Sequence, residues 1–467
     1  MRNSCSTSVY VKSSAAIVFL LFAIYYVTQA QRIDLEANRI YDSLKIEGAP
    51  NETYSLFLPE NYNANDTWPV LYIFDPVGRG ITGIHAFMDA ARAYGYILVC
   101  SNNSKNGPLE TNFEIASHLF FETLSYLSVD HSRIYAAGFS GGSRLAFALA
   151  MQNPIIKGVI GCGAGFPGQN PLVETTFFYL GIVGDLDMNY LEMKKVEEWM
   201  DHINVNNHRI LFEGNHQWPP KESILKSFQW IELNSMQTGE KAVDNKIILE
   251  MYLESYAEAA LLHEEDSNYE YVDLLKRITK RFEKLINVDS LHEQITSLES
   301  DRKYQKGFSD LTELEDHESE LHGYYIGLLK KQLQNPVDTF LTTWKREFRI
   351  LDSRAASKEE MIVKSTSRTI SAIAAWCIET GQFSSSNGDY ETAITVNLAW
   401  LAVRPKDTYA NFRMAKYQAG NGNANKAINY LKRSINNGFR NKAFIINTLE
   451  FKPIMDNKNF KKLLSSM

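Results

Sequence analysis

The chain has 467 residues, of which 45% are hydrophobic and 22% charged, and its formal net charge is −7. This composition supplies a large apolar core and excludes a disordered chain, and the length predicts two or three domains. The mild acidic balance, with no basic stripe along the sequence, argues against nucleic acid as a partner.

Residues 1–30 resemble an export signal. Arg2 and Lys12 precede an uncharged apolar stretch, residues 15–27, and Ala30 closes a short segment suited to cleavage. We therefore expect cleavage after Ala30 and an exported protein, periplasmic or secreted. The apolar run is shorter than the roughly 20 residues that span a bilayer, so a stable membrane anchor is the less favoured alternative.

Residues 31–235 predict an α/β domain with a mostly parallel sheet. Runs rich in β-branched and aromatic residues alternate with helical patterns, at 54–59, 70–74, 96–100, 133–137, 158–162, 177–183 and 209–212. Most of these runs are continuously apolar, which is typical of strands covered by helices on both faces. In such sheets ligands bind beyond the carboxyl ends of the strands, so the loops after these runs are where we expect the site.

The most informative of these loops is Gly138-Phe139-Ser140-Gly141-Gly142. It follows the run at 133–137 and precedes a helical pattern at 144–150. A glycine two residues before and two after the serine permits a strained strand-to-helix turn that exposes the hydroxyl, the arrangement called a nucleophile elbow. The order strand, Gly-x-Ser-x-Gly and helix therefore predicts a nucleophilic Ser140.

Two later loops supply partners for that serine. Asp185 and Asp187 follow the run at 177–183, and His216 follows the run at 209–212. A serine needs a base to take its proton, and a histidine serves as that base when a carboxylate orients it. The chain order Ser, Asp, His is the one used by α/β hydrolases.

With these motifs the zone resembles an α/β-hydrolase domain of the secreted esterase, depolymerase and dienelactone-hydrolase-like branch. The resemblance implies Asp187 as the acid, with Asp185 as the alternative, and an oxyanion hole that includes the N–H of Gly141. It implies a second donor from the loop 74–80, where Pro76 has no N–H, so that Val77 is our choice and Gly78 the alternative. Many relatives carry His-Gly where this chain has Asp75-Pro76, so the chain departs from the family pattern in the loop that holds the second donor.

Other polar features of this zone have simpler interpretations. The segment 102–107 follows the run at 96–100, and a polar turn is favoured there over contact with substrate. His208 is expected at the surface. Cys100, Cys162 and Cys377 remain after signal removal; their odd number and apolar surroundings predict buried free thiols. No metal-binding spacing is present, so no metal or cofactor is expected.

Residues 236–365 predict a helical connecting region, either structural or a cap against the cleft. Apolar residues recur there at spacings of three and four, and charged residues of both signs lie between them; the stripe consists of Tyr271, Leu274, Leu275, Ile278, Phe282 and Leu285.

Residues 366–467 resemble a pair of tetratricopeptide repeats. The segments 388–394 and 422–428 share glycine, alanine and isoleucine positions at a separation of 34 residues, and Pro405 lies where a helix should end. A protein or peptide partner of these repeats is a candidate ligand, and a generic helical array is the alternative.

Taken together, the sequence predicts an exported serine hydrolase that cleaves a small-molecule or polymer-linked ester. Ser140 attacks, His216 moves the proton, Asp187 orients His216, and Gly141 with Val77 holds the oxyanion. Two alternatives stay open, a peptidase or amidase on the same three residues and a non-catalytic interaction protein with an inactive hydrolase fold.

Overall fold

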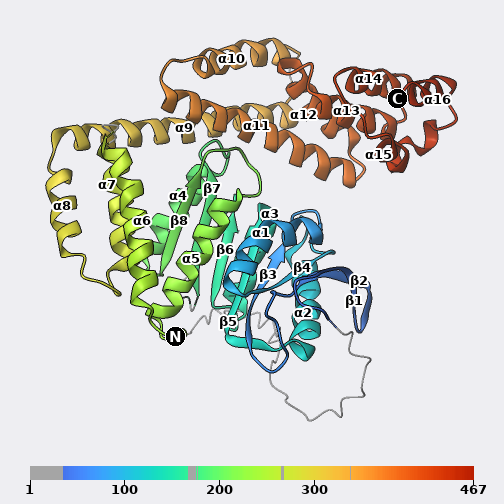
Figure 1. Ribbon diagram of the computed structural model, residues 1–467. Coiled ribbons are helices and arrows are strands. Elements are labelled where there is room, and N and C mark those ends of the chain that lie inside the picture. The colour runs from blue at the N-terminus through green and yellow to red at the C-terminus, as the bar shows by residue number, and fades with distance from the viewer. Residues whose placement is uncertain (1–34, 167–174, 176, 265–267, 337) are drawn as a thin grey trace, which may run out of the picture. The chain divides into compact units, whose positions relative to one another are not determined.

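The computed structural model describes residues 35–166, 175, 177–264, 268–336 and 338–467 (Figure 1). Within it, Ala37–Met467 form one compact unit. The expected signal peptide, residues 1–30, lies outside the described residues. Among the helices that are described, none has both the length and the apolar character required to cross a membrane.

The described residues contain an eight-stranded sheet with the order β1-β2-β4-β3-β5-β6-β7-β8. The strands β2 to β8 correspond to the seven predicted runs. Strand β1 pairs with β2, and β2 with β4, in antiparallel fashion, whereas all the other neighbours are parallel. Strand bounds are β1 Ile40–Ile46, β2 Ala49–Phe57, β3 Trp68–Phe74, β4 Ile97–Ser101, β5 Val129–Phe139, β6 Gly158–Cys162, β7 Phe178–Gly184 and β8 Asn207–Phe212.

Helices cover both faces of this sheet, which explains the continuously apolar strands. Ile73 of β3 faces a core that includes Phe87 of α1 and Phe228 of α5. Its neighbour Tyr72 points the other way and hydrogen-bonds Thr123 of α2 (2.8 Å). The helices are α1 Gly80–Tyr94, α2 Leu109–Tyr126, α3 Gly141–Gln152, α4 Tyr190–His202 and α5 Lys221–Gln237. The predicted α/β-hydrolase fold is confirmed by this mostly parallel, helix-flanked sheet.

The rest of the described chain is helical, as predicted. The predicted apolar stripe lies on α7, where Tyr271, Leu275, Ile278 and Phe282 are buried in one cluster. The helices are α6 Asn245–Glu264, α7 Asn268–Phe282, α8 Asp289–Glu299, α9 Arg302–Gln334, α10 Phe340–Ala355, α11 Glu360–Ser386, α12 Tyr390–Val403, α13 Thr408–Gly420, α14 Ala424–Asn436, α15 Lys442–Asn447, η1 Leu449–Ile454 and α16 Lys458–Ser465.

The 34-residue period corresponds to repeated local structure. Gly388 and Gly422 both adopt positive φ, +81° and +76°, in the turns that precede α12 and α14. Helix α12 ends at Val403, just before Pro405, and α12 packs on α11 while α14 packs on α13. The chain therefore folds here into successive packed helical pairs, and a tetratricopeptide identity stays a prediction.

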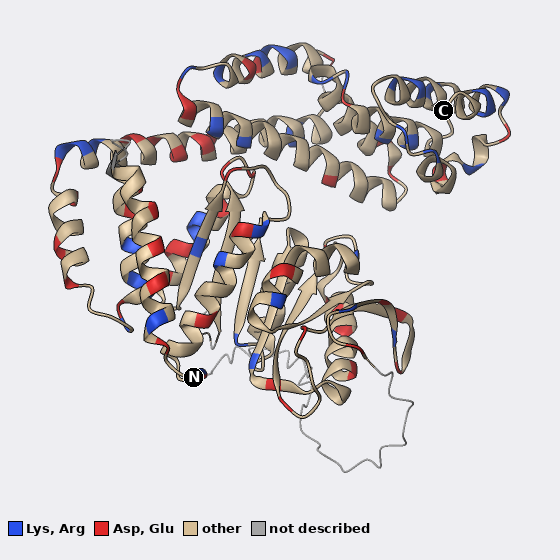
Figure 2. Ribbon diagram, in the orientation of Figure 1, with Lys and Arg blue, Asp and Glu red and all other residues tan. Residues whose placement is uncertain are grey.

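Charges of both signs are interspersed along the helices, and Figure 2 shows Lys and Arg next to Asp and Glu on α6, α7 and α9. Many of these charges form ion pairs one helical turn apart, such as Arg277 with Asp273 (2.6 Å). Such surfaces are typical of solvated helices.

A buried polar junction joins the helices to the loops of the sheet. Arg368 of α11 forms a bidentate pair with Glu318 of α9 (2.8 and 2.5 Å) and donates to the carbonyl oxygen of Asp185 (2.8 Å). Lys364 of α11 binds the Asp185 carboxylate at 3.0 Å. Arg368 also stacks over the ring of Tyr190, 4.3 Å from its centre. Helix α11 is therefore tied to the loop that follows β7.

Candidate active site

The predicted nucleophile elbow is present at the end of β5. Ser140 has φ 53° and ψ −119°, a backbone conformation that residues with a Cβ rarely adopt. A Cβ at Gly138 would lie 2.2 Å from the carbonyl carbon of Gly142, and a Cβ at Gly142 would lie 1.9 Å from the carbonyl oxygen of Phe74. Both glycines are therefore required by close backbone approaches, and the strained turn presents the Ser140 hydroxyl.

The structure brings the three residues predicted for the chemistry together. His216 Nε2 lies 2.9 Å from Ser140 Oγ, and His216 Nδ1 lies 2.9 Å from both carboxylate oxygens of Asp187. Asp187 is completely buried. An imidazole held at Nδ1 by a buried carboxylate keeps Nε2 directed at the hydroxyl, which is the geometry for general-base activation of serine.

Asp185, the alternative acid, has a different environment. One of its carboxylate oxygens accepts the backbone N–H of Gly214 (2.9 Å), and the other pairs with Lys364. The backbone N–H of Leu186 donates to the carbonyl of Gly214 (2.9 Å). Asp185 therefore links the loop carrying Asp187 to the loop carrying His216, and it does not contact the imidazole.

A third loop approaches the same residues. Gly163 follows β6 with φ +65°, and a Cβ there would lie 3.0 Å from Asp187 Oδ2 and 3.2 Å from His216 Nδ1. Asn189 donates from its side chain to the Gly163 carbonyl (2.7 Å), and its backbone N–H donates to Asp187 Oδ1 (2.8 Å). The glycine after β6 thus leaves room for the acid–histidine contact.

The loop after β3 contains the predicted second oxyanion donors, and both have acceptors within the loop. The Val77 N–H donates to Asp75 Oδ1 (2.9 Å), and the Gly78 N–H donates to the Asp75 carbonyl oxygen (3.1 Å). Gly141 is the first residue of α3, where a backbone N–H has no acceptor within its own helix. The N–H of Gly141 therefore has no helical acceptor, whereas the Val77 N–H is engaged by Asp75.

Asp75 organises this loop. The buried carboxylate forms an ion pair with Arg79 (2.8 Å) and accepts the indole N–H of Trp218 (3.3 Å). Burial alone raises the pKa of Asp75, but the hydrogen bonds from Arg79 and from the Val77 N–H outweigh it and leave this pKa below the ordinary value. Asp75 therefore stays ionised and fixes the loop, and Trp218 packs between Phe139 and Phe87.

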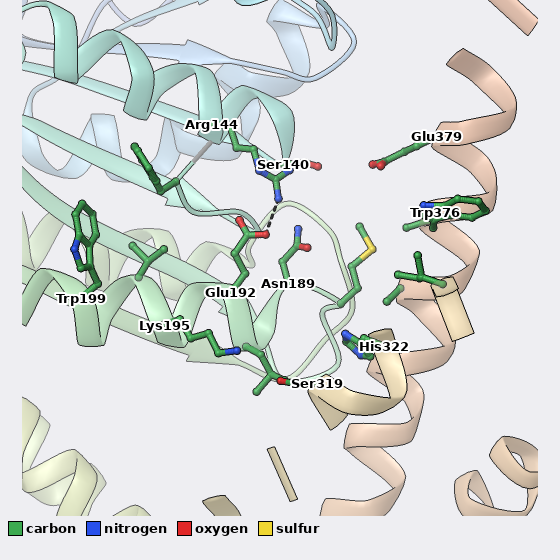
Figure 3. Close-up of a pocket in the computed structure, with 17 residues that line it drawn as sticks. Ser140, Arg144, Asn189, Glu192, Lys195, Trp199, Ser319, His322, Trp376 and Glu379 are labelled. Atoms are coloured by element: carbon green, nitrogen blue, oxygen red, sulfur yellow. Dashed lines mark hydrogen bonds and ion pairs between the residues drawn. The ribbon is translucent and has the colours of Figure 1, made fainter. Parts of the chain in front are cut away.

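An open cleft of about 820 Å³ extends from Ser140 (Figure 3). One wall comes from α3 and α4, and the opposite wall comes from α9 and α11. Figure 3 shows Trp376 and Glu379 on α11 across the cleft from Ser140 and Arg144. Helices α9 and α11 thus line part of the cleft. Residues 236–365 were predicted to be either structural or a cap against the cleft, and α9 has the second role.

Two of the charges inside the cleft neutralise each other. Arg144 pairs with Glu192 (2.7 Å), whose other carboxylate oxygen accepts the Gly165 N–H (2.8 Å). Burial, followed by the nearby charges of Arg368 and Lys195, lowers the pKa of His322 to about 4. His322 is therefore neutral at neutral pH, and the cleft offers a mixed apolar and polar surface.

Sequence reasoning did not identify the residues of α9 and α11 that line this cleft. Ser319, His322 and Trp376 lie 179 or more residues after Ser140 in the chain, and no local pattern marks them as cleft residues. The apolar and small residues at 371–376 are a local signal for a helix, but they do not indicate what that helix faces.

Solved structures with a similar fold include several hydrolases. They include S-formylglutathione hydrolase from Staphylococcus aureus (TM-score 0.36, 13% identity, 42% of this chain and 98% of that chain). An esterase from the archaeon Pyrobaculum calidifontis has TM-score 0.36 and 13% identity over 43% of this chain and 87% of that chain. The feruloyl esterase module from Clostridium thermocellum has TM-score 0.31 and 16% identity over 39% of this chain and 83% of that chain. No protein-family model and no curated protein matches the chain.

Proposed function

We propose that this protein is a serine hydrolase that cleaves carboxylic esters through an acyl-serine intermediate. The observation that carries the proposal is the continuous hydrogen-bonded series from Ser140 through His216 to Asp187, with each contact at 2.9 Å. The strained backbone of Ser140 supports it, because strain of this kind persists where it positions a reacting group.

The proposed reaction has two steps. Ser140 Oγ bonds to the carbonyl carbon of the ester while His216 Nε2 takes the hydroxyl proton, and Asp187 stabilises the imidazolium. The proton then passes from His216 to the departing alcohol as the C–O bond breaks. In the second step a water molecule, activated by His216, attacks the acyl carbon and releases the acid and free Ser140.

A fluorophosphonate probe tests the proposal, because it reacts with activated serines. We expect labelling of the wild-type chain at Ser140, no labelling of Ser140→Ala, and hydrolysis of p-nitrophenyl esters that is lost in the same variant. Folded wild-type protein that takes up no probe and cleaves no ester would favour the non-catalytic alternative. Turnover of aminoacyl amides at rates that exceed those of the matched esters would favour a peptidase or amidase.

We further propose that the enzyme acts outside the cytoplasm, on the basis of the signal-like residues 1–30. N-terminal sequencing of the mature protein is expected to begin at Gln31. A mature chain that retains Met1 would contradict this proposal without affecting the hydrolase assignment.

A further inference from the structure

The loop that follows β4 is bound to the loop that follows β3. The backbone N–H of Asn106 donates to the Pro76 carbonyl oxygen (2.8 Å), and the side chain of Asn102 accepts the backbone N–H of Gly80 (3.0 Å). A Cβ at Gly78 would lie 2.7 Å from the carbonyl oxygen of Asn102. The segment 102–107, which was predicted as a polar turn, therefore forms part of the wall beside the elbow.

The Asn106 side chain lies directly against Gly141. A Cβ at Gly141 would be 1.8 Å from Asn106 Oδ1 and 2.8 Å from its Cγ, so the amide occupies the space next to the Gly141 Cα. Within the described part of the chain no group hydrogen-bonds this amide, and the residue is exposed. Rotation about the bond between Cβ and Cγ exchanges Oδ1 and Nδ2, so either atom can face the elbow.

In the loop after β3, residues 76–79 leave no backbone N–H free to act as the second donor of an oxyanion hole. The N–H groups of Val77 and Gly78 both donate to Asp75, and Pro76 has none. Breaking the Val77 contact would remove a donor from the buried carboxylate that fixes the loop, and breaking the Gly78 contact would remove the donor from the Asp75 carbonyl oxygen. An amide side chain that is free and adjacent to Gly141 provides the missing donor, and side-chain amides are effective in this role.

We propose that Asn106 is a catalytic residue that donates the second oxyanion hydrogen bond through Nδ2, in place of Val77. The proposal depends on the hydrolase function proposed above. When Ser140 Oγ bonds to the carbonyl carbon, the electron pair of the C=O π bond moves to the carbonyl oxygen. The Gly141 N–H and the Asn106 amide then donate to this oxygen until the C=O bond reforms and the alcohol leaves with the proton from His216.

Two variants test the role of the amide. Asn106→Ala removes it, and Asn106→Asp keeps its shape but removes the N–H donors at neutral pH. We expect kcat to fall about 10²–10³-fold in each, with KM within about twofold of wild type, as for the loss of one oxyanion donor elsewhere. Because the side chain is exposed, the thermal unfolding temperature should not change. Lys105→Ala, an exposed neighbour in the same loop, is the matched control and should retain full activity.

A tetrahedral boronic-acid adduct at Ser140 gives a second readout. Its affinity should fall in both Asn106 variants by about the same factor as kcat, because the adduct carries an oxygen in the oxyanion position. Full activity in both variants would overturn the role of Asn106, and so would a KM increase with unchanged kcat. If wild-type protein itself fails to react with the fluorophosphonate, it is the hydrolase proposal that fails.

Discussion

Replacement of Arg368 by Met should destabilise the protein strongly, although Arg368 lies far from Ser140 in the sequence. The substitution leaves Glu318, which is 1% exposed, without the guanidinium that binds both of its oxygens. Removal of one partner from a buried ion pair costs about 3–5 kcal/mol, and the lost hydrogen bond to the Asp185 carbonyl adds about 1 kcal/mol. Equilibrium urea unfolding, monitored by circular dichroism, measures the difference in the free energy of unfolding between the wild type and Arg368→Met.

The pH dependence of the loss follows from Glu318. Burial raises the pKa of Glu318, while the hydrogen bonds and charge of Arg368 oppose that rise. In the Met variant this opposition is absent, so the pKa of Glu318 rises further. A carboxyl group with a higher pKa in the folded state stabilises the fold at low pH, and this contribution is lost as the pH rises. The destabilisation should therefore be larger at pH 7 than at pH 5.

A double variant separates the loss of the pair from the loss of packing. Glu318→Leu combined with Arg368→Met replaces both charges by apolar groups, which is often neutral for a buried pair, so most of the stability should return. A loss below about 1 kcal/mol in Arg368→Met, or a double variant no more stable than the single one, would refute the reasoning. Activity is a further readout, because Arg368 holds the loop between β7 and α4.

Three further predictions concern the cleft and the elbow. Asp187→Asn should lower kcat by about 10⁴-fold. Asp185→Asn should have a far smaller effect, because Asp185 does not contact the imidazole and the substitution preserves its shape. Steady-state kinetics of both variants decide which carboxylate orients His216. Gly142→Ala places a Cβ 1.9 Å from the Phe74 carbonyl oxygen, so fluorophosphonate labelling should be lost and stability should fall by about 1–3 kcal/mol; normal labelling would show that the elbow tolerates a side chain. Ala372→Trp, on the α11 wall, should lower kcat/KM for p-nitrophenyl octanoate about tenfold while p-nitrophenyl acetate is hydrolysed normally; equal effects on both esters would argue against a substrate-binding role for this wall.

The sheet and the close approach of Ser140, Asp187 and His216 were predictable because their signals are local. Continuous apolar strands followed by polar loops identify the carboxyl edge of a buried sheet, and Ser140, Asp187 and His216 each lie within four residues of the end of such a strand. The three free cysteines were also predicted correctly as buried. Strand β1 was not predicted, because it is an edge strand with polar residues such as Asp42 and Lys45 and lacks the apolar run of the central strands.

What the sequence did not reveal depends on contacts between distant residues. His208 was expected at the surface, and this prediction is wrong. The imidazole ring of His208 is buried and stacks on Trp230, and its Nε2 lies 2.6 Å from a guanidinium nitrogen of Arg281. Burial and the charge of Arg281 hold the pKa of His208 well below the ordinary value. Likewise, the use of the Val77 N–H by Asp75 and the contact of Asn106 with Gly141 follow from how two loops fold on each other, which residue spacing does not encode.

The hydrogen bond from Arg368 to Asp185 has a consequence for the order in which the protein is made. The two residues are 183 positions apart, so a ribosome must add α5 to α10 and the first part of α11 before this contact can form. Domains generally fold as they emerge, N-terminal parts first. The sheet can therefore be complete while the loop carrying Asp187 still lacks its support from α11. Hydrolytic competence should appear late in synthesis, only after residue 368 has emerged, and a nascent chain that stalls earlier would carry a finished elbow with an unbraced acid loop.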